Sequence, residues 1–219
     1  MRRLRRLVVI GSLSLYSMVK ADESSSGQIA SDGIVIVTDV RTGVNYSLDS
    51  RLLQAQQNLV EGTIKFSKRN KSAVVIVDKL ARRLDLYDKG KFLESYVVSL
   101  GRNPYDDKVY EFDGCTPEGM YKITRIRDGK VDQTFFYKAL MIDYPTRRDW
   151  TEFRAAKAKE SIPEMVDNPG GDIEIHGHGN AERDWTAGCV ALMNDDIDKL
   201  FKHVYVGMPV TIVKSYQKK

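Results

Sequence analysis

The sequence is poor in cysteine and histidine, with 2 Cys and 3 His among 219 residues. Cys115 and Cys189 allow at most one structural disulfide, the common fate of a cysteine pair outside the cytosol; alternatively, one of them is a reactive thiol. His176, His178 and Cys189 could supply three zinc ligands. A structural zinc site needs four, and the fourth would have to be His203 or Cys115. We therefore expect no metal and no cofactor.

Acidic residues are missing from the first 21 positions. The net charge of +4 suggests an anionic partner such as nucleic acid. When the five basic charges of residues 1–21 are subtracted from +4, residues 22–219 carry −1. The excess charge belongs to the leader, so we expect no nucleic-acid partner. The basic residues of the leader are Arg2, Arg3, Arg5, Arg6 and Lys20.

Long apolar runs are also absent beyond the leader. Residues 1–21 combine a basic stretch, the apolar run Leu7–Val19 and the small-residue site Val19-Lys20-Ala21, which together predict a signal peptide. The run is shorter than the roughly 20 residues of a bilayer span, and the alternative is an uncleaved N-terminal anchor. We expect an exported protein of the periplasm or cell-wall space, with no membrane span after cleavage of the signal peptide.

The exported part divides into two regions. Residues 22–71 read as a flexible segment, a short strand at Ile34–Thr38 and a helix over Asp49–Ile64, capped by Asp49 or Ser50. Ser67–Lys71 reads as a polar link. We therefore place a boundary near residue 71 and a single folded domain at residues 72–215.

Short apolar or alternating runs recur through the domain, and few helices interrupt them, which predicts a mostly-β fold. The predicted helices are Thr151–Glu160 and Asn194–Phe201, the second with Asn194 as N-cap. The predicted strands are Ala73–Val77, Leu84–Tyr87, Phe92–Leu100, Gly119–Ile126, Ala139–Ile142, Ile173–His176 and Val210–Val213.

One stretch carries the residue types of thiol chemistry. A strand ends at His176, a glycine-rich segment follows, and Gly188 precedes Cys189. A nucleophilic thiol needs an imidazole partner and backbone N–H groups that can face an oxyanion. A neighbouring imidazolium lowers the pKa of a thiol from its ordinary value near 8.5. The spacing alone leaves a buried structural cysteine as the alternative.

Several ordered motifs resemble the L,D-transpeptidase catalytic domain of bacterial cell-wall enzymes, over about residues 72–214. The central ones are Ile175-His176-Gly177 and Thr186-Ala187-Gly188-Cys189-Val190. Many members have His where this chain has Ala187 and Arg where it has Ala191, and most have a longer loop between His and Cys. The first two changes are typical of the branch with a Trp-Thr-x-Gly-Cys pattern. Supporting motifs are Asp78-Lys79, Arg83-Leu84, Ser99-Leu100-Gly101, the segment 116–123 (Thr-Pro-Glu-Gly-Met-Tyr-Lys-Ile), Asp143-Tyr144-Pro145, residues 168–173, Asp184-Trp185-Thr186 and residues 191–194.

The resemblance implies a β-sandwich and a peptidoglycan L,D-transpeptidase that takes part in cell-wall organisation and cell shape. Cys189 would form a thioester with a tetrapeptide stem and release D-Ala, and an amine of a second stem peptide would complete the cross-link. His176 would activate the thiol, itself oriented by a backbone carbonyl. The alternatives are an L,D-carboxypeptidase, an enzyme that attaches or detaches an outer-membrane lipoprotein, and a non-catalytic wall-binding module.

The same resemblance suggests roles for neighbouring residues. The backbone N–H of Cys189, with that of Gly188 or Ala187, would form the oxyanion hole; Gly188 could equally be a turn glycine. Four residues are candidates for substrate binding, each with a plainer alternative: Thr186 (the end of a strand), Trp185 (core), His178 (a solvated loop) and Tyr144 (core packing). Arg183 and Asp184 read as a solvated loop pair or as contacts to a charged stem peptide. We expect Cys115 to be buried and reduced, or reversibly regulatory.

Overall fold

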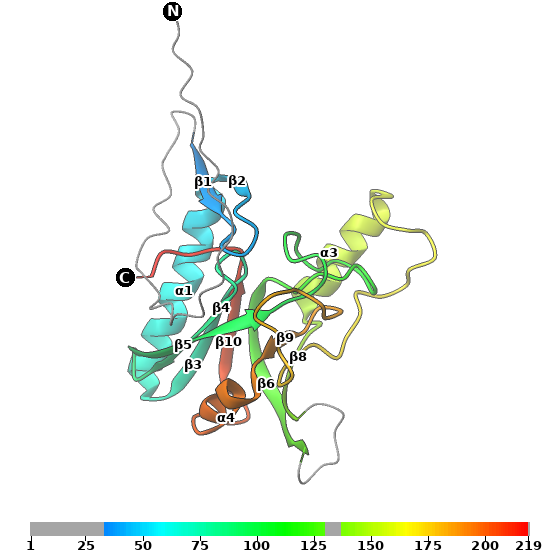
Figure 1. The fold of residues 1–219 in the computed structure, drawn as a ribbon. Coiled ribbons are helices and arrows are strands. Elements are labelled where there is room, and N and C mark those ends of the chain that lie inside the picture. The colour runs from blue at the N-terminus through cyan, green and yellow to red at the C-terminus, as the bar shows by residue number, and fades with distance from the viewer. Residues whose placement is uncertain (1–32, 130–136, 219) are drawn as a thin grey trace, which may run out of the picture.

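The computed structural model describes residues 33–129 and 137–218, and its architecture is mostly β, as the sequence predicts (Figure 1). The predicted signal peptide and flexible segment, residues 1–32, lie outside the described residues. Within the described ranges, no helix is both long and apolar enough to cross a membrane. The elements are β1 (Ile34–Thr38), β2 (Asn45–Asp49), α1 (Ser50–Asn70), β3 (Ala73–Asp78), β4 (Arg83–Asp88), β5 (Lys91–Ser99), β6 (Gly119–Asp128), β7 (Lys138–Ile142), α3 (Arg147–Ala158), β8 (Glu174–His176), β9 (Val190–Leu192), α4 (Asn194–Phe201) and β10 (Pro209–Val213).

Two sheets face each other across a common core and close into a barrel. The strand order is β10-β3-β4-β5-β9-β8-β7-β6, and β10 pairs with β6 to close it. The long strands β5 and β6 belong to both sheets: β5 pairs with β4 up to Val97 and with β9 at Val98 and Ser99. In the same way, β6 pairs with β10 through Lys122 and with β7 from Ile123 onward. The sandwich therefore has no open edge at these corners.

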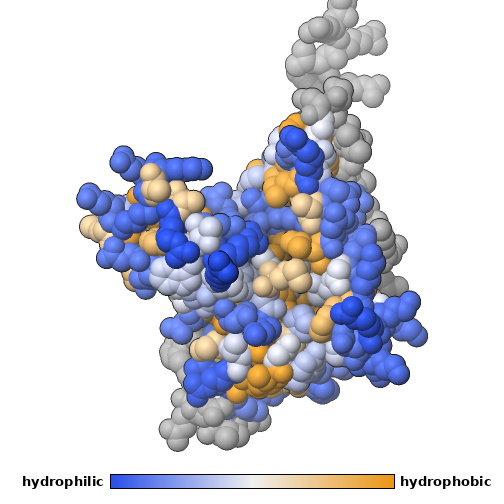
Figure 2. Space-filling model, turned by 180° about the vertical axis from the view of Figure 1, so that it is seen from behind, coloured by the Kyte–Doolittle hydropathy of each residue, from blue (hydrophilic) through white to orange (hydrophobic). Residues whose placement is uncertain are grey.

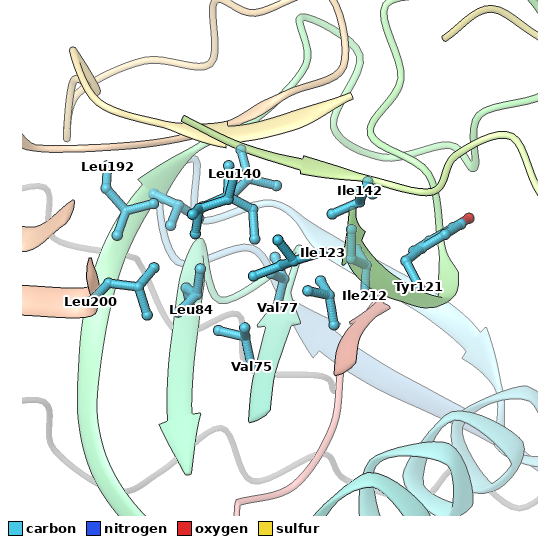
Figure 3. Packing of buried hydrophobic residues seen from close by; sticks show 14 of the residues in the cluster. Val75, Val77, Leu84, Tyr121, Ile123, Leu140, Ile142, Leu192, Leu200 and Ile212 are labelled. Carbon is cyan, nitrogen blue, oxygen red and sulfur yellow. The ribbon is translucent and has the colours of Figure 1, made fainter. Parts of the chain in front are cut away.

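The apolar run of β3 is continuous because both faces of this strand are buried. Val75 and Val77 point into the barrel, where they pack with residues of the opposite sheet such as Leu140 (Figure 3). Val74 and Ile76 point outward and pack against α1, which covers this face. Helix α1 is therefore a structural part of the domain and not a separate appendage.

Helix α1 is longer than the predicted Asp49–Ile64, although Asp49 does cap it by accepting a hydrogen bond from the Arg51 N–H. The predicted polar link is its last turn. Ser67 is buried there, and its hydroxyl accepts a hydrogen bond from the N–H of Gly90 in the β4–β5 turn. Basic residues near a helix C-terminus are favourable to the helix dipole, so this polar composition is typical of a helix end.

Other differences have local causes. Helix α3 begins at Arg147, because the Asp149 carboxylate accepts a hydrogen bond from the Thr146 N–H and starts the helix one turn early. Helix α4 spans the predicted residues, but its N-cap is Met193. The side chain of Asn194 instead accepts a hydrogen bond from the His178 N–H. Strands β2 and β9 were not predicted; each is short, and β9 has no alternating pattern.

Candidate active site

Strand pairing places His176 and Cys189 on one face of the sheet. Strands β8 and β9 are parallel, with Ile175 opposite Val190 and His176 opposite Ala191. Ile175 and Val190 lie in the core. Because side chains alternate along a strand, His176 and Cys189, which directly precedes β9, both point to the outer face. In Figure 1, β8 and β9 lie between the projecting α3 and the part of the molecule that carries α1.

The thiol of Cys189 is half-buried and held by backbone groups. Its Sγ accepts a hydrogen bond from the Glu174 N–H at 3.4 Å and donates to the Asp172 carbonyl at 3.6 Å. The Glu174 carboxylate, on the same outer face, forms an ion pair with Arg127. No motif in the sequence marks these partners, because Asp172 and Glu174 contact the thiol through their backbone.

The imidazole of His176 is 1% exposed and is oriented by a carbonyl. Its Nδ1 lies 2.6 Å from the Gly177 oxygen. A carbonyl only accepts, so Nδ1 carries the proton of the neutral ring and Nε2 carries the lone pair. The edge-to-face contact with Trp185, with ring centroids 5.9 Å apart, fixes the ring plane.

Burial keeps the Cys189 thiol and the His176 imidazole neutral. Burial raises the pKa of the Cys189 thiol to about 12, and the nearby Asp172 carboxylate adds to the shift. Burial lowers the pKa of His176 to about 4, and His178 lowers it further, against the opposing effect of the Gly177 carbonyl. The resting site therefore holds a thiol and an imidazole, and not the thiolate–imidazolium pair that the sequence suggested.

This ionisation state predicts the reactivity of the thiol. Iodoacetamide should alkylate Cys189 with a rate that rises about tenfold per pH unit from pH 7 to pH 10, because the thiolate fraction does so below the pKa. Peptide mass spectrometry at each pH measures the rate. A rate that levels off below pH 8 would show that the thiolate is already formed at neutral pH.

The turn that carries Cys189 is organised by Thr186, which is buried. The Thr186 hydroxyl donates to the Cys189 carbonyl at 2.8 Å and accepts from the Gly188 N–H at 3.1 Å. The Gly188 N–H is thus already bonded, so an oxyanion hole here would use the N–H groups of Cys189 and Ala187. Gly188 has φ +138°, and a Cβ at this position would lie 2.6 Å from the carbonyl oxygen of Cys115. Close approach of this backbone explains the glycine.

The other candidates divide between surface and core. His178 is exposed, and its ring lies 6.4 Å from that of Tyr137. Trp185 is half-buried against His176. Tyr144 belongs to the core, with its hydroxyl bonded to the Pro169 carbonyl at 2.9 Å, so we remove it from the substrate-binding set.

Asp184 is neither solvated nor open to a ligand. Its side chain is 10% exposed, and both of its oxygens accept hydrogen bonds from arginines. The partners are Arg41 and Arg82, which are distant in sequence and had no predicted role. The neighbouring Arg183 is exposed.

Cys115 is a free thiol, as is Cys189. It is 2% exposed, and burial raises its pKa to about 12. The structure therefore agrees with a buried, reduced Cys115. Among residues 33–129 and 137–218, no three His, Cys, Asp or Glu side chains are arranged to hold a metal ion.

The surface opposite to the view of Figure 1 is mostly hydrophilic, with hydrophobic patches between its two projecting parts (Figure 2).

The model of one family, the L,D-transpeptidase catalytic domain (YkuD), matches residues 72–212. Among solved structures, the chain is similar to Bd1075 of Bdellovibrio bacteriovorus, with 23% identity, a TM-score of 0.46 and coverage of 67% of this chain and 50% of that one. It thus spans about half the length of that structure.

The chain is also similar to the helical cell shape determining protein Pgp2 of Campylobacter jejuni, with 20% identity, a TM-score of 0.48 and coverage of 71% of this chain and 57% of that one. An L,D-transpeptidase of Xylanimonas cellulosilytica gives 17% identity, a TM-score of 0.43 and coverage of 65% and 61%. A comparison with curated proteins finds no match.

Proposed function

Since the chain belongs to the L,D-transpeptidase catalytic-domain family, we propose that it is a peptidoglycan L,D-transpeptidase with Cys189 as its nucleophile. The donor substrate is a tetrapeptide stem, and the acceptor is an amine of a second stem peptide. The site of action is the periplasm or cell-wall space, where this substrate lies. Export itself stays a prediction, because residues 1–21 lie outside the described residues.

The observation that carries the proposal is the shared face of His176 and Cys189. His176 ends β8, and Cys189 immediately precedes the adjacent parallel strand β9, so the imidazole and the thiol share the outer side of the sheet. A residue at or beside the end of a regular strand is positioned more precisely than one in the middle of a loop. The Gly177 carbonyl orients the imidazole so that Nε2 is its basic nitrogen.

The chemistry follows from a neutral pair. Cys189 Sγ attacks the carbonyl between the third and fourth residues of the stem while His176 Nε2 takes its proton. The N–H groups of Cys189 and Ala187 stabilise the oxyanion. The C–N bond breaks, His176 returns the proton to the leaving D-Ala amine, and a thioester stays on Cys189. The acceptor amine then attacks the thioester, loses a proton to His176 and regenerates the thiol.

Product analysis tests this proposal. The protein is incubated with disaccharide-tetrapeptide, and its products are separated by mass. We expect release of D-Ala together with a cross-linked dimer. Free disaccharide-tripeptide without dimer would mean that water is the acceptor and the protein is an L,D-carboxypeptidase. No release of D-Ala would reject the proposal.

A further inference from the structure

Four charged side chains form a cluster beneath the loop that leads to Cys189. Arg82, at the β3–β4 turn, is 2% exposed and places its Nη2 2.8 Å from Asp39 Oδ2 and its Nε 2.8 Å from Asp184 Oδ2. Arg41 completes the cluster, with its Nη1 2.6 Å from Asp184 Oδ1. Two of the four residues, Asp39 and Arg41, come from the β1–β2 connection. They lie outside residues 72–212, which the family model matches.

The β1–β2 connection is folded so that Arg41 points inward. The Asp39 carboxylate is fully buried, and its Oδ1 accepts the N–H groups of Arg41 at 2.9 Å and Thr42 at 2.8 Å. The Val40 N–H donates to the Leu80 carbonyl at 3.2 Å and ties the connection to the β3–β4 turn. In Figure 1 the β1–β2 hairpin stands at the N-terminal end of α1.

The Asp184 carboxylate accepts a backbone hydrogen bond in addition to those from the two arginines. Its Oδ1 also accepts the Leu100 N–H at 2.8 Å, just beyond the end of β5. Arg41 reaches the same strand through Nη2, which donates to the Val98 carbonyl at 2.9 Å. Arg41 therefore clamps Asp184 onto β5. Charged hydrogen bonds at such low exposure are stronger than bonds at the surface.

From Asp184 the constraint passes along residues 185–188 to the nucleophile. The N–H groups of Trp185 and Thr186 both donate to the Leu100 carbonyl at 3.1 Å. Trp185 packs on the imidazole of His176. Thr186 bonds the Cys189 carbonyl and the Gly188 N–H. The segment that follows Asp184 therefore contacts both members of the thiol–imidazole pair: Trp185 contacts His176, and Thr186 contacts Cys189.

We propose that Arg41 is a positioning residue of the active site: it acts through Asp184 to hold segment 184–189, so that the catalytic unit includes the N-terminal segment 33–71. This inference rests on the proposed function. A site of this kind needs its groups held within a fraction of an ångström. Within residues 72–212, Asp184 is held by the Arg82 guanidinium and the Leu100 N–H, and Arg41 adds the second charged bond.

Arg41→Met removes the clamp while it preserves much of the side-chain volume. We expect kcat for D-Ala release to fall about tenfold or more, with KM changed far less, because the misplaced groups act on the chemical step. The matched control is Arg51→Met, since the Arg51 side chain is 92% exposed on α1 and forms its ion pair with Asp49, at the start of the same helix; it should retain the wild-type rate.

Alkylation gives an independent readout in the same variant. A loosened segment 184–189 exposes Cys189, so its thiol should react with iodoacetamide severalfold faster at pH 8, while the buried Cys115 stays unmodified. The catalytic rate and the thiol reactivity then move in opposite directions. If the wild type releases no D-Ala, the proposed function fails, and the alkylation result alone decides the role of Arg41.

A double-mutant cycle with Asp184→Asn tests the route. If Arg41 acts through Asp184, the double variant should be little worse than Asp184→Asn alone. Additive effects overturn the proposal, as does an Arg41→Met variant with the wild-type kcat and alkylation rate. Equal modification of Cys115 and Cys189 in Arg41→Met would show that this variant has lost its fold. Should Arg41→Met fail to fold, Arg41→Lys replaces it; Lys keeps the charge but cannot bridge two acceptors as Arg does, so an intermediate kcat is expected.

Discussion

Cys189→Ala should reduce D-Ala release to background, a loss on the order of 10³-fold or more, because the proposed thioester forms on the Cys189 sulfur. Intact-mass measurement during turnover checks the same step: the wild type should gain the mass of a disaccharide-tripeptide acyl group, and Cys189→Ala should gain none. The substitution removes only the sulfur from a half-buried position, so the thermal midpoint should stay near that of the wild type.

The chain offers its own control in Cys115, the second free thiol. Cys115→Ala opens a small cavity in a buried site, so it should lower the thermal midpoint but keep the acyl adduct and most of the activity. Undiminished D-Ala release by Cys189→Ala would contradict the thiol mechanism. It would also leave the non-catalytic wall-binding module as the better explanation.

The fold could be predicted where local pattern and tertiary burial agree. The apolar run of β3 marks a strand because both faces of β3 are buried. The alternating residues of β4 mark a strand because β4 forms a hairpin with β5. The end of α1 could not be predicted, since the burial of Ser67 depends on the distant Gly90 turn. Whether the corners of a β-sandwich close depends on long-range pairing, which no local pattern encodes.

The site could be predicted as far as its motif residues, and no further. The sequence marked His176 and Cys189 by their motifs, and it predicted that a backbone carbonyl orients His176, which the Gly177 carbonyl does. Their common face follows from the pairing of β8 with β9, which the motifs do not encode. The ionisation state could not be read from the sequence, because it depends on burial, and burial makes the pair neutral. Asp184 looked solvated for the same reason: Arg41, 143 residues earlier in the chain, buries it.

Gly188→Ala should both destabilise the protein and impair catalysis. The new Cβ would lie 2.6 Å from the Cys115 carbonyl and 3.0 Å from Ile173 Cδ1, on a residue with φ +138°. Backbone strain and overpacking together should cost about 2–5 kcal/mol in the free energy of unfolding, which a urea titration measures. The displaced turn also carries Cys189, so kcat should fall by about tenfold or more in the molecules that stay folded. Gly171→Ala is the matched control, since a Cβ there meets nothing within 4 Å. If Gly188→Ala and Gly171→Ala both had the wild-type free energy of unfolding and the wild-type kcat, the Cys115 backbone would not be what requires glycine at position 188.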